Sequence, residues 1–189
     1  MRPIRLTMSA FGSYADRVTI EFDRGREGLF LITGDTGSGK TTIFDAIMYA
    51  LYDEMSGGNR SGNMMRSQYA DADTDTWVEF TFEYGNNIYS VRRNPEYIRQ
   101  SKRRNADGSA RYTTEKPDVT LTMPDGSEFT GNKKEVNGKI VEIIGLDAKQ
   151  FAQVAMIAQG DFMKLLYADS DDRRAVSYTH LTLPTTPYV

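Results

Sequence analysis

Apolar and polar residues alternate in several short stretches of the chain, which is the pattern expected of half-buried β-strands. Residues 4–8 and 18–22 show it near the start. The alternation is clearest over 78–84, and Gly85-Asn86-Asn87 separates this stretch from a second one at 88–93. Two alternating stretches joined by such a turn predict an antiparallel hairpin.

Other apolar patterns predict elements of different kinds. Residues 29–32 form a continuous apolar run, as expected of a strand covered on both faces. Residues 43–51 carry apolar side chains at helical spacing, and 136–144 do so up to Gly145, a residue typical of a helix end. Residues 151–157 are apolar again and are predicted to be a further buried strand.

The composition limits the kind of protein without naming a function. Of the 189 residues, 39% are hydrophobic and 26% are charged, a balance typical of a globular domain. The start lacks the features of a signal peptide, and no apolar run approaches the roughly 18 residues of a membrane-spanning helix. There are no cysteines, so disulfides and thiolate metal sites are excluded. We expect a cytoplasmic protein without a membrane partner.

The segment after the strand at 29–32 contains a complete Walker A pattern, Gly-x-x-x-x-Gly-Lys-Thr, and a predicted helix follows it. Glycines let backbone N–H groups approach a phosphate, and a helix N-terminus adds partial positive charge. We expect Lys40 to reach the β- and γ-phosphates of ATP, the Thr41 hydroxyl to bind Mg²⁺, and Thr42 to lie near the α-phosphate. The predicted nucleotide-binding residues are Gly34, Asp35, Thr36, Gly37, Ser38, Gly39, Lys40, Thr41 and Thr42.

Walker A motifs occur in kinases, GTPases, helicases and ABC-type ATPases, so a second motif has to discriminate among these classes. The block at 153–162, Gln-Val-Ala-Met-Ile-Ala-Gln-Gly-Asp-Phe, resembles the Q-loop of ABC and SMC-like ATPases. In that class a glutamine at the end of a strand reaches Mg²⁺ and the attacking water. The resemblance therefore assigns Gln159 a catalytic and metal-binding role beside Lys40.

Several blocks together resemble the SbcC family, the SMC-like ATPase subunits of the bacterial SbcCD nuclease. They lie at 1–11, 31–47, 84–97 and 153–162, and the likeness spans residues 1–175. It implies an α/β fold, the N-terminal half of an ABC/SMC-type P-loop ATPase head with a mixed central sheet and an antiparallel β subdomain. It also implies ATP-dependent DNA repair, in which an SbcD-like nuclease subunit processes double-stranded DNA ends and hairpins, and a second head forms a homodimer.

The chain departs from that family after Gln159. No Walker B strand with paired acids, signature motif, coiled coil or switch histidine follows. Because Walker B supplies a Mg²⁺-holding carboxylate and the general base, these residues alone are expected to bind nucleotide at most weakly and to show no ATP turnover. Residues 176–189 contain no Asp, Glu, Lys or Arg and resemble a translated sequencing adapter. We interpret them as a non-native tail, and expect the natural protein to continue past about residue 175.

Residues 92–116 carry eight basic residues against three acidic ones, whereas the whole chain has a net charge of −3. A local patch of this kind favours contact with DNA phosphates, and the alternative is a solvated hairpin loop. The residues considered for DNA contact are Arg92, Arg93, Arg99, Lys102, Arg103, Arg104 and Arg111, with Tyr97 and Tyr112 between them. Three other functions stay open: an SMC-like ATPase that tethers DNA without a nuclease partner, a P-loop kinase or transferase, and an inert truncated fragment.

Overall fold

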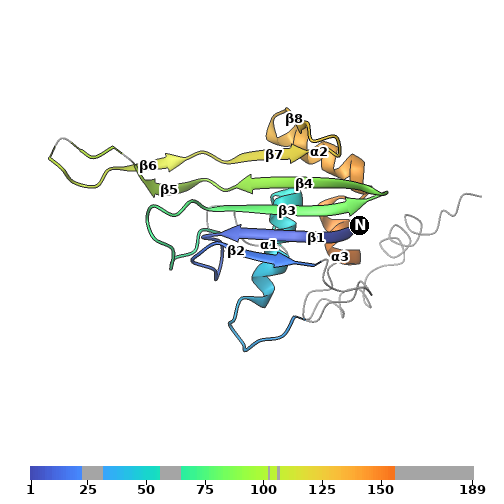
Figure 1. The fold of residues 1–189 in the computed structure, drawn as a ribbon, viewed down its shortest axis with the longest axis horizontal. Coiled ribbons are helices and arrows are strands. Elements are labelled where there is room, and N and C mark those ends of the chain that lie inside the picture. Colours follow the sequence, from blue (N-terminus) through green and yellow to red (C-terminus); the bar gives the residue numbers. More distant parts are fainter. Residues whose placement is uncertain (23–31, 56–64, 102, 106, 156–189) are drawn as a thin grey trace, which may run out of the picture. The chain divides into compact units, whose positions relative to one another are not determined.

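The computed structural model describes residues 1–22, 32–55, 65–101, 103–105 and 107–155, and the chain divides into two units, 1–145 and 146–189. The first unit is an antiparallel β-sheet with two helices (Figure 1). Its strands are β1 (Arg2–Ser9), β2 (Val18–Glu21), β3 (Trp77–Tyr84), β4 (Asn87–Asn94), β5 (Tyr97–Gln100), β6 (Tyr112–Glu115), β7 (Asp118–Thr122) and β8 (Glu128–Phe129). Its helices are α1 (Lys40–Tyr52) and α2 (Lys133–Ile144), and α3 (Ala148–Ala155) belongs to the second unit.

Six of the described strands form one sheet in the order β2-β1-β3-β4-β7-β8, and every neighbouring pair is antiparallel. The predicted hairpin is confirmed as β3 and β4, and its turn has positive φ angles at Gly85 and Asn86, as a tight hairpin turn requires. β5 and β6 form a separate two-stranded ribbon that extends beyond the sheet from β4 and β7 (Figure 1). The antiparallel part of the predicted fold is therefore present, and the expected strand at 29–32 lies outside the described residues.

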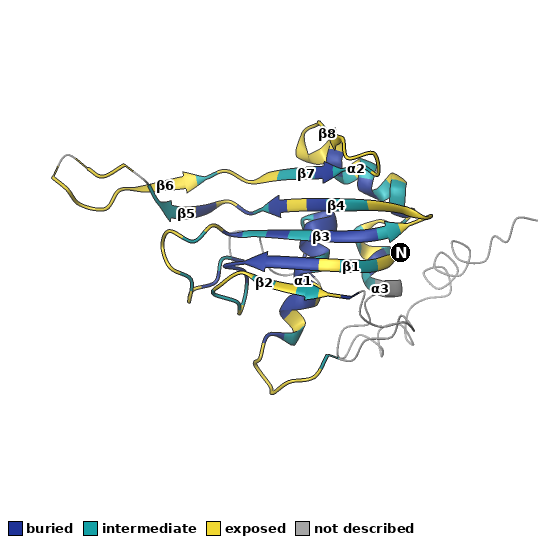
Figure 2. Cartoon of the chain, in the orientation of Figure 1, coloured by how far each residue is buried: buried dark blue, intermediate teal, exposed yellow. Residues whose placement is uncertain are grey.

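The core of the first unit lies between one face of this sheet and the helices α1 and α2. Along the central strands β1, β3 and β4, alternate residues point inward and are buried, and Figure 2 shows buried stretches on these strands. The residues between them point to the opposite face of the sheet. One row on that opposite face runs from Thr7 through Glu79 and Arg92 to Thr120. The buried set includes Leu6, Met8, Val78, Phe80, Phe82, Val91 and Leu121 from the strands and Tyr49, Leu51, Val136 and Ile140 from the helices.

The ends of α2 follow directly from its sequence. The Asn132 side chain accepts hydrogen bonds from the backbone N–H groups of Lys134 and Glu135, and the Glu135 carboxylate accepts one from the Asn132 N–H. This reciprocal arrangement is a capping box. Gly145 ends the helix in the left-handed conformation with φ 77°, which confirms the predicted helix end.

One predicted element is wrong. The apolar run at 151–157 predicts a strand, but residues 148–155 form the helix α3. A local cap explains the difference, because the Asp147 carboxylate accepts from the Gln150 N–H at 2.8 Å and the Gln150 side chain accepts from the Asp147 N–H at 3.0 Å. Gln159 and residues 176–189 lie outside the described residues. Within the described part of the chain, no helix has the length and hydrophobicity to cross a membrane.

Candidate nucleotide-binding site

The Walker A residues lead from an exposed loop into the first turn of α1. The helix begins at Lys40 with Gly39 as its N-cap, and among the residues that the structure describes no side chain caps this end. The first N–H groups of any helix lack intrahelical partners, and a side-chain cap would normally satisfy some of them. At α1 they stay available, together with the positive end of the helix dipole, so this helix end suits an anionic ligand.

Lys40 lies over the loop that precedes the helix. Its ammonium group donates hydrogen bonds to the carbonyl oxygens of Gly34, at 2.6 Å, and Asp35, at 2.7 Å. A Cβ atom added to Gly37 would meet no other atom within 4 Å, so the space beside the loop is open. Thr41 is exposed. The loop thus presents an ammonium group, a hydroxyl group and free backbone amides at one accessible place, and these groups fit the phosphates of a nucleotide.

A second loop, between β1 and β2, closes one side of this site. The Tyr14 ring lies against Gly39 so closely that an added Cβ at Gly39 would be 3.2 Å from ring carbons. The Tyr14 hydroxyl donates a long hydrogen bond, 3.4 Å, to the Gly39 carbonyl, and burial raises the pKa of this tyrosine. The Ser13 and Thr42 hydroxyl oxygens are 3.3 Å apart.

Gly12 allows the β1–β2 loop to come this close. Its φ angle is 56°, and a Cβ atom at this position would be 2.4 Å from the Thr42 Cγ2 atom. Two backbone hydrogen bonds stabilise the loop. The Gly12 N–H donates to the Met65 carbonyl at 2.7 Å, and the Ser67 N–H donates to the Ala10 carbonyl at 2.8 Å. Sequence reasoning missed this contact, and the combination of a glycine and an aromatic residue in a short turn was the available signal.

The basic stretch at 92–116 does not form one continuous surface. The Arg93 side chain is 1% exposed, because the alternation along β4 points Val91 and Arg93 into the core and Arg92 out of it. Its Nε atom donates to the Ala50 carbonyl at 3.1 Å, and its Nη2 atom donates to the Asn137 side chain at 2.6 Å. The prediction that Arg93 contacts DNA is therefore wrong.

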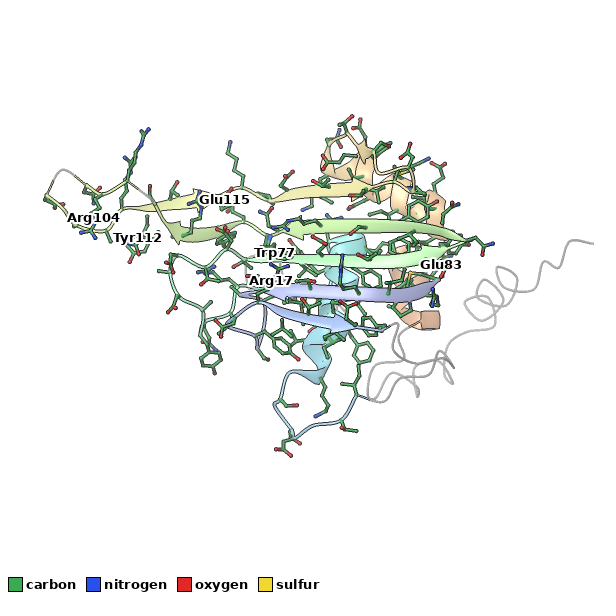
Figure 3. All side chains as sticks on the ribbon, viewed as in Figure 1. Arg17, Trp77, Glu83, Arg104, Tyr112 and Glu115 are labelled. Carbon is green, nitrogen blue, oxygen red and sulfur yellow. The ribbon has the colours of Figure 1, made fainter. Side chains whose placement is uncertain are left out.

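Two other arginines of this stretch have partners within the sheet and the ribbon. The Arg92 guanidinium lies 3.8 Å from the centre of the Trp77 ring. The Arg17 guanidinium lies 5.4 Å from the same ring centre, and Figure 3 shows Arg17 beside Trp77. Arg99 pairs with Glu115 at 2.6 Å.

Three exposed arginines of this stretch lie towards the end of the ribbon. Arg103, Arg104 and Arg111 are exposed, and Figure 3 shows Arg104 and Tyr112 on the part of the ribbon beyond the sheet. Tyr112 is 59% exposed. Arg92, on β4, and Lys116, between β6 and β7, are also exposed, so the exposed basic residues of this stretch are spread along the ribbon and the neighbouring sheet.

Comparison with known proteins supports the same kind of site as the geometry does, a nucleotide-binding site. A family model described as an AAA domain matches residues 5–180. The SbcC subunit of the nuclease SbcCD from Vibrio cholerae is 42% identical over 178 residues, and that from Lactococcus lactis is 36% identical over 179 residues. Both matches cover 93% of this chain, which spans only 17% of the length of either relative.

Among solved structures, the SMC head domain from Thermotoga maritima is 19% identical. The match covers 74% of this chain and 42% of that one with a TM-score of 0.35, and at that score the likeness supports nothing further.

Proposed function

This chain belongs to the family of AAA domains, and from that premise we propose that it is the ATP-binding N-terminal part of an SbcC-like DNA-repair ATPase. The N-terminus of α1 carries the proposal, because an uncapped helix end lies beside the Lys40 ammonium group. The likeness to the SbcC subunit of the nuclease SbcCD over 93% of the chain supports the same conclusion. In the whole protein, this part would work with an SbcD-like nuclease subunit on ends and hairpins of double-stranded DNA.

In this proposal, residues 34–42 bind the phosphates of ATP, and Lys40 supplies their positive counter-charge. Among the described residues no cluster of three or more His, Cys, Asp or Glu side chains could hold a metal ion. The ligands for Mg²⁺ would then be the Thr41 hydroxyl, phosphate oxygens and Gln159, in keeping with the preference of Mg²⁺ for few protein ligands. A second head in a homodimer would complete the site. We propose that the protein is cytoplasmic.

Titration of the chain with MgATP tests the nucleotide site. We expect Lys40→Met to weaken binding by at least about tenfold, because a hydrogen bond to a charged group contributes about 1.5–3 kcal/mol. Lys134→Met is the matched control, since Lys134 is exposed in the first turn of α2 and lies outside the motif. Equal binding by the two variants, or no binding by the unmodified chain at millimolar MgATP, would contradict the proposal.

We further propose that the exposed end of the ribbon contacts DNA. Arg103, Arg104 and Arg111 supply positive charge in a chain whose net charge is −3. Arginine contacts to phosphates are independent of sequence and weaken as the salt concentration rises, because the release of counterions from DNA is then less favourable. The exposed Tyr112 ring offers a flat surface beside these charges.

Charge reversal tests the DNA contact in a complete head. The double variant Arg103→Glu/Arg104→Glu should lower the affinity for double-stranded DNA and flatten its dependence on salt. The control Lys134→Glu/Lys139→Glu changes the net charge equally on α2 and should have a smaller effect. A DNA affinity that depends on salt but is the same in both double variants would argue against a role for the ribbon.

A further inference from the structure

Arg93 is a buried cation for which the nucleotide site gives no explanation. Its side chain is 1% exposed, and burial lowers its pKa while the neighbouring Asp53 carboxylate acts in the opposite direction. Burying a charge is unfavourable, and an apolar side chain of similar volume is often at least as stabilising at such a position. The presence of an arginine at this position is therefore explained by its polar contacts, which an apolar residue cannot make.

Those contacts join three elements of the first unit. From β4, Arg93 donates to the Ala50 carbonyl in the last turn of α1 and to the Asn137 side chain on α2, at 3.1 and 2.6 Å. The last four carbonyl groups of a helix have no intrahelical partner, and a cation is favourable at the negative end of the helix dipole. The guanidinium group thus caps the C-terminus of α1 and ties it to both neighbours.

Asp53 belongs to the same network. It is the C-cap residue of α1 and has φ 63°, a conformation in which glycine is usual at helix ends. Its carboxylate pairs with Lys133 at the start of α2 and lies 3.8 Å from the Arg93 Nη1 atom. A side chain retained in an unfavourable backbone conformation indicates that its contacts offset the strain.

Polar contacts supplement apolar packing at this corner of the unit. A cavity of about 110 Å³ borders the network and is lined in part by Asp53, Arg93 and Lys133. Within the described residues, the Nη1 atom of Arg93 makes no hydrogen bond. The hydrogen bonds of Arg93 and the ion pairs of Asp53 therefore act together with the packing of the last turn of α1, in which Ala50 and Leu51 are fully buried.

The network lies at the opposite end of α1 from the P-loop. A helix of 13 residues is about 20 Å long and behaves as a stiff rod. Tyr14 and Ser13 contact its N-terminal end, and Arg93 and Asp53 hold its C-terminal end. We propose that Arg93 is a positioning residue that fixes the P-loop helix from its C-terminal end and thereby sets where Lys40 and the first-turn amides lie. The consequence for nucleotide binding rests on the proposed function, whereas the hold on α1 does not.

Variants of two residues, with one control, separate positioning from general stability. Arg93→Met keeps much of the side-chain volume and removes the charge, and Asp53→Gly keeps the helix cap but removes the carboxylate. Arg92→Met is the matched control, because Arg92 is the next residue of β4 and points to the other face. Amide hydrogen exchange would be measured in the nucleotide-free chain over α1 and, for comparison, over β3, and MgADP affinity would be measured separately.

We expect exchange over α1 to rise at least about tenfold in Arg93→Met, because both charge-assisted hydrogen bonds of the guanidinium are lost, with β3 unchanged. MgADP affinity should fall by a similar factor. Asp53→Gly should change both quantities in the same direction, and Arg92→Met should change neither. Arg93→Lys should recover only part of the loss, because one ammonium group cannot reproduce the two directed contacts of the guanidinium.

Two results of the exchange measurement would overturn the proposal. If exchange rises equally over α1 and β3, Arg93 acts on the stability of the whole unit and the proposal is overturned, as it is if neither changes. Should Arg93→Met not fold, Asp53→Gly and Arg93→Lys decide in the same way. If the unmodified chain binds no MgADP, the proposed function fails, while the exchange comparison still decides whether Arg93 holds α1.

Discussion

Replacing Gly12 by alanine would test the close contact between the β1–β2 loop and the P-loop helix. Alanine at the left-handed φ of 56° costs about 1 kcal/mol. The new Cβ would also lie 2.4 Å from the Thr42 Cγ2 atom, well inside van der Waals contact, and relieving such overlap costs about 1–3 kcal/mol. We therefore expect Gly12→Ala to lower the free energy of unfolding by about 2–4 kcal/mol, or to displace the loop from Thr42.

Gly126→Ala is a matched control for this experiment. Gly126 has φ 82°, also in the left-handed region, but an added Cβ would meet nothing within 4 Å. The backbone penalty and the loss of unfolded-state entropy are then similar in the two variants, so the difference between them isolates the steric contact.

Urea unfolding monitored by circular dichroism would give both free energies, provided that the denaturant slopes agree. MgADP titration would show whether the shift of Thr42 reaches the nucleotide site, and we expect weaker binding only in Gly12→Ala. If both variants lose the same stability and bind MgADP like the unmodified chain, the contact between Gly12 and Thr42 does not shape the site.

Three further predictions concern separate parts of the chain. Asn132→Ala should lower the free energy of unfolding by about 1 kcal/mol in urea melts, because the capping box with Glu135 is lost. The 189 residues alone should show no steady ATP hydrolysis, and a measured turnover that Lys40→Ala abolishes would refute this. Burial, with the Asp53 carboxylate nearby, raises the pKa of Tyr49, so the folded state favours the neutral side chain. The resulting contribution to the free energy of unfolding is present below about pH 10 and is lost as the pH rises above that value. Stability should fall less steeply there in Tyr49→Phe, measured by urea melts at each pH.

Much of the fold could be predicted because it depends on local patterns. Alternation of apolar residues located β1, β2, β3 and β4, and Gly145 marked the end of α2. The Walker A pattern placed the start of α1, and the P-loop ATPase class and the likeness to the N-terminal region of SbcC are confirmed by the comparisons. The roles of the individual Walker A residues stay predictions.

The errors arose where two local signals competed or where distant segments meet. For α3, the apolar run at 151–157 is compatible with a strand or a helix, and the reciprocal cap of Asp147 and Gln150 is the signal that decides. The contact of Tyr14 with Gly39 joins residues 25 positions apart, and no periodic pattern in either segment records it. Contacts of this kind depend on the packing of the β1–β2 loop onto α1.

The adjacent arginines of β4 show how a correct pattern can still lead to a wrong conclusion. Alternation along the strand requires one of Arg92 and Arg93 to point into the core, given that Val91 does. Charge alone argues for the surface at both positions, and this preference prevailed in the sequence interpretation. The core is acceptable for Arg93 because the Ala50 carbonyl group in the last turn of α1 and the Asp53 carboxylate lie beside the guanidinium group. Those partners come from a helix some forty residues earlier in the chain, so the strand pattern gives the direction of the side chain and only the tertiary fold gives its reason.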